Sequence, residues 1–481
     1  MIEGDHGRDV RSGIGTRFRE ATSYWIQNWV QLMVASLPTA PQPAQLVRAI
    51  GRWSLIALVI NSTIGGGIFG LPSSVAALTG TSSPLAVVLA GLCLGVIIAC
   101  FSEVSSRFDS AGGPYLYSRV AFGRAAGLQT AWMLWLAQVA AQAANANLLI
   151  VYLGEFWPAA TNPLTRFVLL TVLIGFLAAV NFYGVRAGTR VNNVLTVAKI
   201  LPLLAVVAAG LILLPGHTHA AMTAPPIPQR AWLKAVLILF FGIGGFESAL
   251  APMSEAKNPR RDAPIAIIAS VISSTALYAL ILWVVVSALP DPAHSTRPLA
   301  DVARIFAGPT GAALVAIGAI VSVYGILSAK ILAMPRVAFA LAERGDLPRI
   351  FAAVHPRFRT PYVALFAWTL CIWAFALAGR FEWNLTLSAV ARLFYYAVIC
   401  AALPVLRRKH PGQARLNLPA APLFAALGVL ICLVLLTQVN FGQSMILGVT
   451  ILLALANWLW ARQANPPGPA RPPAAPASAR A

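Results

Sequence analysis

The sequence predicts an all-α protein that crosses a membrane twelve times. Of its 481 residues, 58% are hydrophobic and 10% are charged, and the mean hydropathy is +0.75. Apolar runs of about 20 residues, the length that a helix needs to span the hydrocarbon core, recur along the chain. Two of the expected spans are interrupted by glycines. A soluble protein could not bury this much apolar surface, so the chain is expected to be a polytopic membrane protein.

Three regions are expected from composition: a polar leader over residues 1–50, a membrane domain over 51–462, and a disordered Pro/Ala-rich tail over 463–481. The leader is an interfacial helix carrying Trp25 and Trp29, a disordered tail, or an overextended start with Met33 as the initiator. The membrane domain divides into apolar spans at 52–75, 84–104, 126–153, 166–183, 191–214, 232–252, 264–289, 309–334, 361–379, 385–405, 421–440 and 442–461.

The net charge of +20 orients the chain in the membrane. Lys and Arg gather in the loops that follow the even-numbered spans. The opposite loops hold only Arg166, Arg230, Lys234, Arg297, Arg304 and Arg380. Cytoplasmic loops carry such an excess of basic residues, so both termini are expected in the cytoplasm and the protein in the inner membrane. This pattern favours contact with anionic lipids and gives no indication of nucleic-acid binding.

Other function classes find little support. The five cysteines lie in apolar spans without a CxxC pair, which favours buried thiols over a disulfide or metal site. Neither a Walker loop, nor a zinc-binding HExxH, nor a nucleophile elbow occurs in a plausible setting, and the loops are too short for a catalytic domain. The sequence therefore predicts no enzyme and no cofactor, and it favours transport driven by gradients or exchange.

The two interruptions lie at residues 61–72 and 240–247, in corresponding places of the two halves of the chain. In hydrocarbon every backbone N–H and C=O needs a partner, so irregular backbone survives there only beside protein or a cavity. Paired breaks of this kind indicate a transporter's substrate site. The alternative is that the glycines only allow close helix packing.

Several motifs are similar to those of the amino acid–polyamine–organocation (APC) superfamily. They are the glycine-rich first span and the segments at 111–117, 245–248, 255–262 (Glu-Ala-Lys-Asn-Pro-Arg-Arg-Asp), 334–336, 343–348 and 355–361. The resemblance implies a leucine-transporter-type fold, with spans 1–5 and 6–10 as inverted repeats, discontinuous helices 1 and 6, and peripheral spans 11 and 12. It also implies substrates that are amino acids or their decarboxylated amines.

A broken helix exposes amides where one half begins and carbonyls where the other ends. A zwitterion fits such a pair of ends. We therefore expect the substrate carboxylate at the amides of Gly65, Gly66 and Gly67. Its ammonium is expected at carbonyls around Phe241 and Gly244 and near Ile64. The resemblance further implies an aromatic gate, for which Phe241 is the candidate; the alternative is that Phe241 and its neighbour Phe246 only pack.

Charge inside a span is costly and therefore suggests function. The resemblance implies that Lys199 takes the place of a sodium ion, which makes Lys199 a candidate proton carrier. The alternatives are that Lys199 stays charged and binds carbonyls of the first break, or that its side chain snorkels towards the cytoplasm. Glu247 either couples protons and gating or only accepts hydrogen bonds. Lys330 is expected to repel cationic substrates, unless it pairs with Glu247. Arg392 is expected to pair with Glu382 or to lie near an interface.

A polar stripe in the third span, formed by Gln138, Gln142 and Asn145, lies on one helical face. It lines a water-filled path or bonds neighbouring helices.

Together these observations predict a permease that works by alternating access, by proton symport of neutral amino acids. Exchange of amino acids or amines is the close alternative. A sensor that binds without transporting is the alternative from another class, and an ion channel is the third. The expected partners are an amino acid, protons and membrane lipids, and the oligomeric state stays open.

Overall fold

The computed structural model describes residues 51–108, 113–183, 189–214, 227–247, 258–412 and 414–464, without the side chains of 54, 57, 58, 61, 189–199 and 259. Within these ranges the regular structure is helical and contains no strand, so the predicted all-α class is confirmed. The expected leader, and the expected tail beyond residue 464, lie outside the described residues.

The described residues form fourteen labelled α-helices, one of which, α11, is interrupted. In chain order they are α2 (Arg52–Thr63), α3 (Gly67–Thr79), α4 (Ser83–Ser105), α5 (Gly113–Phe122), α6 (Arg124–Leu153), α7 (Pro163–Tyr183), α8 (Thr189–Leu213), α9 (Gln229–Ile243), α10 (Pro259–Ala288), α11 (Pro298–Glu343), α12 (Tyr362–Ala378), α13 (Phe381–Lys409), α14 (Ala421–Leu436) and α15 (Phe441–Ala464). Ala307 and Gly308 interrupt α11 with non-helical backbone.

A helix lies within each expected span. Within the described ranges, seven stretches are long and apolar enough to cross a membrane: Gly67–Ser105, Arg124–Leu153, Pro163–Tyr183, Arg260–Ala288, Pro298–Glu343, Phe381–Lys409 and Phe441–Ala464. Three further apolar helices are shorter, namely Ile200–Leu213, Tyr362–Ala378 and Ala421–Leu436. The number of crossings therefore stays a prediction.

Both expected interruptions are present. Helix α2 ends at Thr63 and α3 begins at Gly67, with Ile64 in a non-helical conformation (φ −74°, ψ 89°). Helix α9 ends at Ile243, and Gly245 then adopts φ +105°, a conformation that glycine reaches without steric penalty. Residues 248–257, which follow this second break, lie outside the described part.

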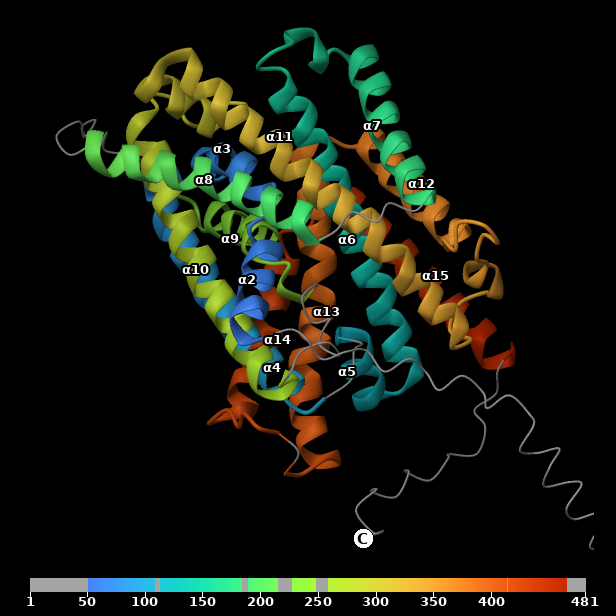
Figure 1. The fold of residues 1–481 in the computed structure, drawn as a ribbon. Helices are drawn as coiled ribbons and strands as arrows, with labels where there is room; N and C mark the ends of the chain where they lie inside the picture. The colour runs from blue at the N-terminus through green and yellow to red at the C-terminus, as the bar shows by residue number, and fades with distance from the viewer. Residues whose placement is uncertain are drawn as a thin grey trace, which may run out of the picture. The chain divides into compact units, whose positions relative to one another are not determined.

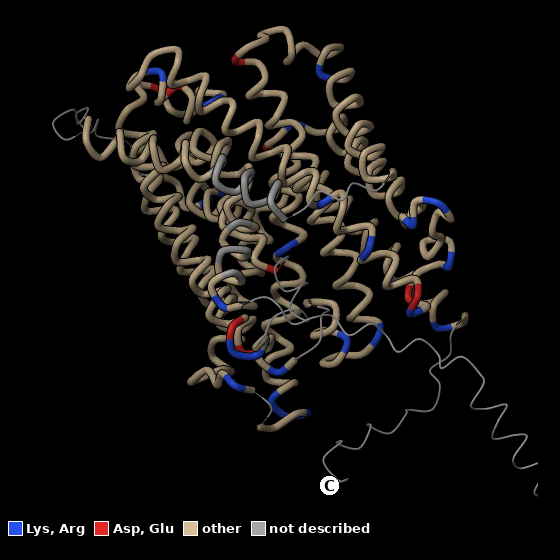
Figure 2. Tube along the Cα trace, in the orientation of Figure 1, with Lys and Arg blue, Asp and Glu red and all other residues tan. Residues whose placement is uncertain are grey.

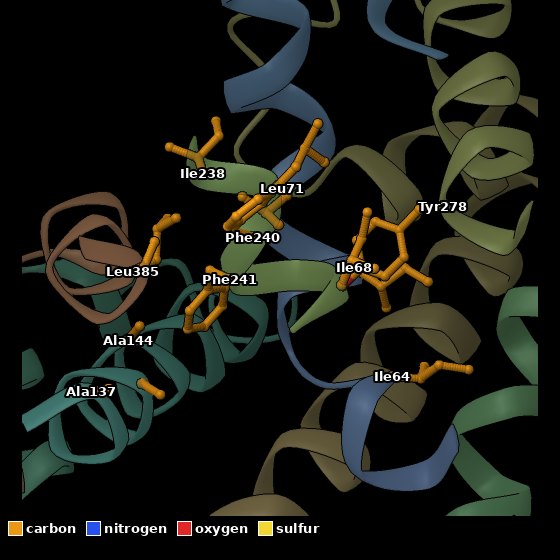
Figure 3. Packing of buried hydrophobic residues seen from close by; sticks show 14 of the residues in the cluster. Ile64, Ile68, Leu71, Ala137, Ala144, Ile238, Phe240, Phe241, Tyr278 and Leu385 are labelled. Atoms are coloured by element: carbon orange, nitrogen blue, oxygen red, sulfur yellow. The ribbon is translucent and has the colours of Figure 1, made fainter. Parts of the chain in front are cut away.

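The helices form two packed groups, and the broken helices α2, α3 and α9 belong to the first (Figure 1). In the first group α2 and α4 pack against α10, and α3 packs against α9. In the second, α6 packs against α11 and α12, and α7 packs against α12; α13 contacts both groups, through α6 and α4. Figure 3 shows Leu71 of α3 beside Phe240 of α9, where the two broken helices meet in the buried core.

Charged residues lie mostly toward the ends of the helices, as Figure 2 shows. Glu103, at the end of α4, binds Arg107 at 2.7 Å and Arg407 of α13 at 2.6 Å. Its Oε2 also accepts the backbone N–H of Leu418. This buried carboxylate ties α4 to α13 and to the segment before α14.

A second buried carboxylate, Asp346, ties α5 and α6 to the turn after α11. It binds Arg119 at 2.8 Å and Arg124 at 2.7 Å, and it accepts a hydrogen bond from Tyr115. Burial and the neighbouring Asp346 raise the pKa of the Tyr115 phenol, so Tyr115 remains a protonated donor. The carboxylate thus joins the second half of the loop between the second and third expected spans to the turn that follows the eighth.

Candidate functional site

A small cavity lies where the two broken helices meet α6, α11 and α13. Its volume is about 40 Å³, above the roughly 10–15 Å³ that a cavity needs to hold a water. Its lining residues come from both breaks and from the three intact helices: Ser62, Thr63, Gly65, Gly66, Gly67, Gln138, Ala141, Gln142, Asn145, Phe241, Gly242, Gly244, Gly245, Ile326, Lys330 and Arg392.

The three glycines of the first break differ in their surroundings. A Cβ added to Gly67 would meet the Cα of Gly242 at 3.1 Å, so α3 and α9 approach each other through two glycines. At Gly66 a Cβ would collide with Asn145 Oδ1, whereas at Gly65 its nearest neighbour would be Ile326 Cδ1 at 3.7 Å, an ordinary contact. Close packing therefore explains Gly66 and Gly67 in part but does not explain Gly65. The first amides of α3, which begins here, have no partner within the helix.

The second break is covered by an arginine. Gly244 is extended (φ −74°, ψ −177°), and a Cβ added there would come within 2.5 Å of Arg392 Nη1. The guanidinium carbon of Arg392 also lies 6.0 Å from the centre of the Phe241 ring, within the range of a cation–π contact. Arg392 therefore occupies the region next to the carbonyls where the substrate ammonium was expected.

Behind Arg392 lies the carboxylate of Glu247, whose side chain is 1% exposed. Its Oε1 accepts a hydrogen bond from Tyr395 at 2.7 Å and lies 3.5 Å from Arg392 Nη1. Its Oε2 accepts from Tyr396 and from the backbone N–H of Gly245, each at 3.1 Å. Arg392, Tyr395 and Tyr396 lie three and four residues apart and so on one face of α13. The carboxylate thus fixes the backbone of the second break to α13.

The polar residues of α6 line the cavity. Gln138, Gln142 and Asn145 are each at most 4% exposed and face the cavity together, and Asn145 donates to Gln142 at 3.5 Å. The stripe therefore borders a polar space, and its printed hydrogen bond lies within α6. Lys330 of α11 lines the same cavity from another side.

The structure brings most of the expected residues together. Gly65, Gly66, Gly67, Phe241 and Gly244 all line the cavity.

Two of the expected residues lie elsewhere. Ile64 is buried next to the break and is not a lining residue, and in Figure 3 its side chain points away from Phe241. Phe246 stacks on Tyr396, with ring centres 5.6 Å apart, and so has a packing role. Lys199 lies in α8, but its side chain is outside the described part.

The structure corrects one expectation about Arg392. It was expected near Glu382 or an interface, but it pairs with Glu247, while Glu382 accepts a hydrogen bond from Ser74 at 2.6 Å. Glu247 has Arg392 as an ion-pair partner, and the expected pairing of Glu247 with Lys330 stays a prediction. The spacing of Arg392, Tyr395 and Tyr396 was the available signal, since a cation with two phenols on one face suits a buried carboxylate.

In the part of the chain that the structure describes, no group of three or more His, Cys, Asp or Glu side chains could hold a metal ion. The described lining of the cavity offers helix ends, side-chain amides and two cationic side chains.

Comparison with known proteins agrees with this arrangement. The family model for amino acid permeases matches residues 50–456. The methylthioribose transporter of Bacillus subtilis is 29% identical over 420 residues, which cover 83% of this chain and 90% of that protein. The serine/threonine exchanger of the same organism is 26% identical over 428 residues, 85% of this chain and 95% of its own length.

A plant relative is similar over a smaller share of its length. The vacuolar cationic amino acid transporter 2 of Arabidopsis thaliana is 26% identical over 391 residues, covering 77% of this chain and 61% of that protein. Because the family model spans both broken helices, the cavity and nearly all of the helical body, this chain belongs to the amino acid permease family, within the APC superfamily.

Proposed function

We propose that this protein is a secondary active transporter of amino acids that works by alternating access around the cavity between the two broken helices. The observation that carries the proposal is that both breaks open onto one polar cavity. Irregular backbone at corresponding places in two helices is suited to binding a small zwitterion. Transport through this site needs no covalent step.

The head group of the substrate binds at the first break. Its carboxylate lies at the amides of Gly65, Gly66 and Gly67, where the positive end of the α3 dipole favours an anion. Its ammonium lies at the carbonyl end of α2 near Ile64, with the α9 carbonyls at Phe241 and Gly244 as further acceptors. Phe241, which borders the cavity and is 7% exposed, closes over the bound substrate.

The membrane arrangement proposed for this site is twelve crossings, with spans 1–5 and 6–10 as inverted repeats and both termini in the cytoplasm of an inner membrane. Helix contacts support the repeat: α4 packs on α10, α3 on α9, and α6 on α11. These pairs join the second span to the seventh, the first to the sixth, and the third to the eighth, as a two-fold axis between the repeats requires.

Proton symport is the first choice for coupling, with Lys199 as the proton carrier and Glu247 linking the second break to α13. Exchange is the alternative, and it gains weight from the relative named as a serine/threonine exchanger. Amino acids without a cationic side chain are the first substrate class, because Lys330 disfavours cationic ones. The relative named as a methylthioribose transporter makes an uncharged thiosugar a second candidate substrate.

Counterflow in proteoliposomes tests the proposal. Purified protein is reconstituted, loaded with one unlabelled amino acid, and assayed for entry of labelled amino acids and of methylthioribose, with and without a pH gradient. Stimulation by an acidic exterior supports symport, whereas flux that requires substrate on both sides supports exchange. Saturable binding without flux of any solute would contradict the transporter and indicate a sensor.

A further inference from the structure

Two cations border the cavity, and one carboxylate lies behind them. Lys330 of α11 and Arg392 of α13 are lining residues, whereas Glu247 is not. Among the residues whose side chains the structure describes, this wall of the cavity therefore carries two positive charges against one negative charge. Charged side chains inside a membrane span are energetically costly, so the excess of one positive charge at this wall suggests a function.

Glu247 offers little further hydrogen bonding to Arg392. Its two oxygens already accept from Tyr395, Tyr396 and the amide of Gly245. Its separation from Arg392 Nη1, 3.5 Å, is longer than the roughly 2.7–2.9 Å of a charge-assisted hydrogen bond. The pair thus compensates charge without satisfying the donors of the guanidinium.

Two guanidinium atoms of Arg392 remain without an acceptor. In the described part of the chain, Nε and Nη1 are buried and have no hydrogen-bond partner. Native structures seldom leave buried donors in this state, because each loses its bonds to water. Nη1 lies beside Gly244 of the second break, and Arg392 is a lining residue of the cavity. They point to a ligand group that accepts hydrogen bonds.

A carboxylate is the group that fits. A guanidinium N–H makes a charge-assisted hydrogen bond to one oxygen of a carboxylate, and Lys330 adds a second positive charge to the same cavity. With the substrate's head group at the first break, this wall faces the substrate's side chain. We infer that Arg392 and Lys330 bind a carboxylate on that side chain, so that aspartate and glutamate are the preferred substrates; this rests on the proposed transport function.

The test compares an acid with its isosteric amide. Wild-type proteoliposomes are assayed for uptake of labelled L-aspartate and L-asparagine, with L-glutamate, L-glutamine and L-lysine as competitors. We expect aspartate to be preferred over asparagine by about tenfold or more, the factor that one charge-assisted hydrogen bond supplies, and lysine to compete least.

Two variants assign the preference to this wall. Lys330→Gln removes one cation, and the double variant Glu247→Gln with Arg392→Gln removes the guanidinium without leaving an unpaired buried charge. In each, the ratio of aspartate to asparagine uptake should fall toward one. Arg349→Gln, which removes an exposed cation far along the chain, is the matched control and should keep the ratio. Size-exclusion chromatography checks that each variant folds. If the double variant is misfolded, the result for Lys330→Gln alone decides the test.

The outcomes separate the two proposals. Uptake of asparagine or serine without a preference for aspartate overturns the inference and leaves the transport function standing. Equal losses for aspartate and asparagine in the variants also overturn it, because they would assign this wall to the common α-carboxylate. Binding with no flux of any amino acid removes the transport function itself.

Discussion

At the scale of single residues, the glycines of the two breaks are not equivalent. A Cβ added to Gly65 would make only ordinary contacts, while one added to Gly244 would collide with the carbonyl of Phe240 and the guanidinium of Arg392. A carbonyl fixed in a helix cannot move aside easily, whereas an ordinary van der Waals contact needs no adjustment. The same substitution at the two positions should therefore have opposite consequences for stability.

We predict that Gly244→Ala lowers the free energy of unfolding by about 1–3 kcal/mol, as overpacking does. Gly65→Ala should leave it unchanged or raise it by up to about 1 kcal/mol, because its φ is not left-handed and the Cβ meets Ile326 at 3.7 Å. Thermal melting of both purified variants in detergent measures the difference. Equal losses in the two variants would contradict the described geometry of the first break.

At the scale of helices, buried carboxylates hold the ends of separate elements together. Glu103 has a side chain that is 0% exposed, and it binds Arg107 just after α4, Arg407 of α13 and the amide of Leu418. Asp301, by contrast, is 33% exposed and lies 3.9 Å from Arg304. The first ion-pair site is shielded from water and the second is not.

We predict that Glu103→Ala destabilises the protein by about 3–5 kcal/mol, because it strands the buried Arg107 without its partner. Asp301→Ala, the matched control, should cost about 1 kcal/mol or less. Melting temperatures in detergent, with the yield of monodisperse protein, provide the measurement. A loss at Asp301 as large as that at Glu103 would show that burial does not govern these pairs.

The sequence predicted the helical elements better than it predicted the side-chain contacts. The apolar runs located a helix in every expected span, and the glycines located both breaks. Both patterns are local, because the hydrocarbon core constrains each segment of the chain directly. Arg392 was missed because its role depends on which face of α13 meets α9, and contacts between distant segments set that face. The stripe of Gln138, Gln142 and Asn145 stayed ambiguous for the same reason, since a polar face of α6 suits either a helix or a cavity.

At the scale of the whole membrane domain, the proposed orientation places the segment between α10 and α11 outside the cell and the turn after α11 inside. His294 lies in the first, with a side chain that is 86% exposed, and Arg349 lies in the second and is exposed. In a background without the native cysteines, an impermeant maleimide should label His294→Cys in intact cells. It should label Arg349→Cys only after permeabilisation. The reverse pattern would invert the topology.

The volume of the cavity has a consequence for measured affinity. With a volume of about 40 Å³, the cavity is expected to dilate when it admits an amino acid together with its side chain. The walls at Phe241 and α6 must move apart before the solute binds or as it binds. Its apparent dissociation constant then rises in inverse proportion to the fraction of dilated protein, about tenfold when that fraction is a tenth. A substitution that props the walls apart should therefore tighten equilibrium binding while it slows turnover.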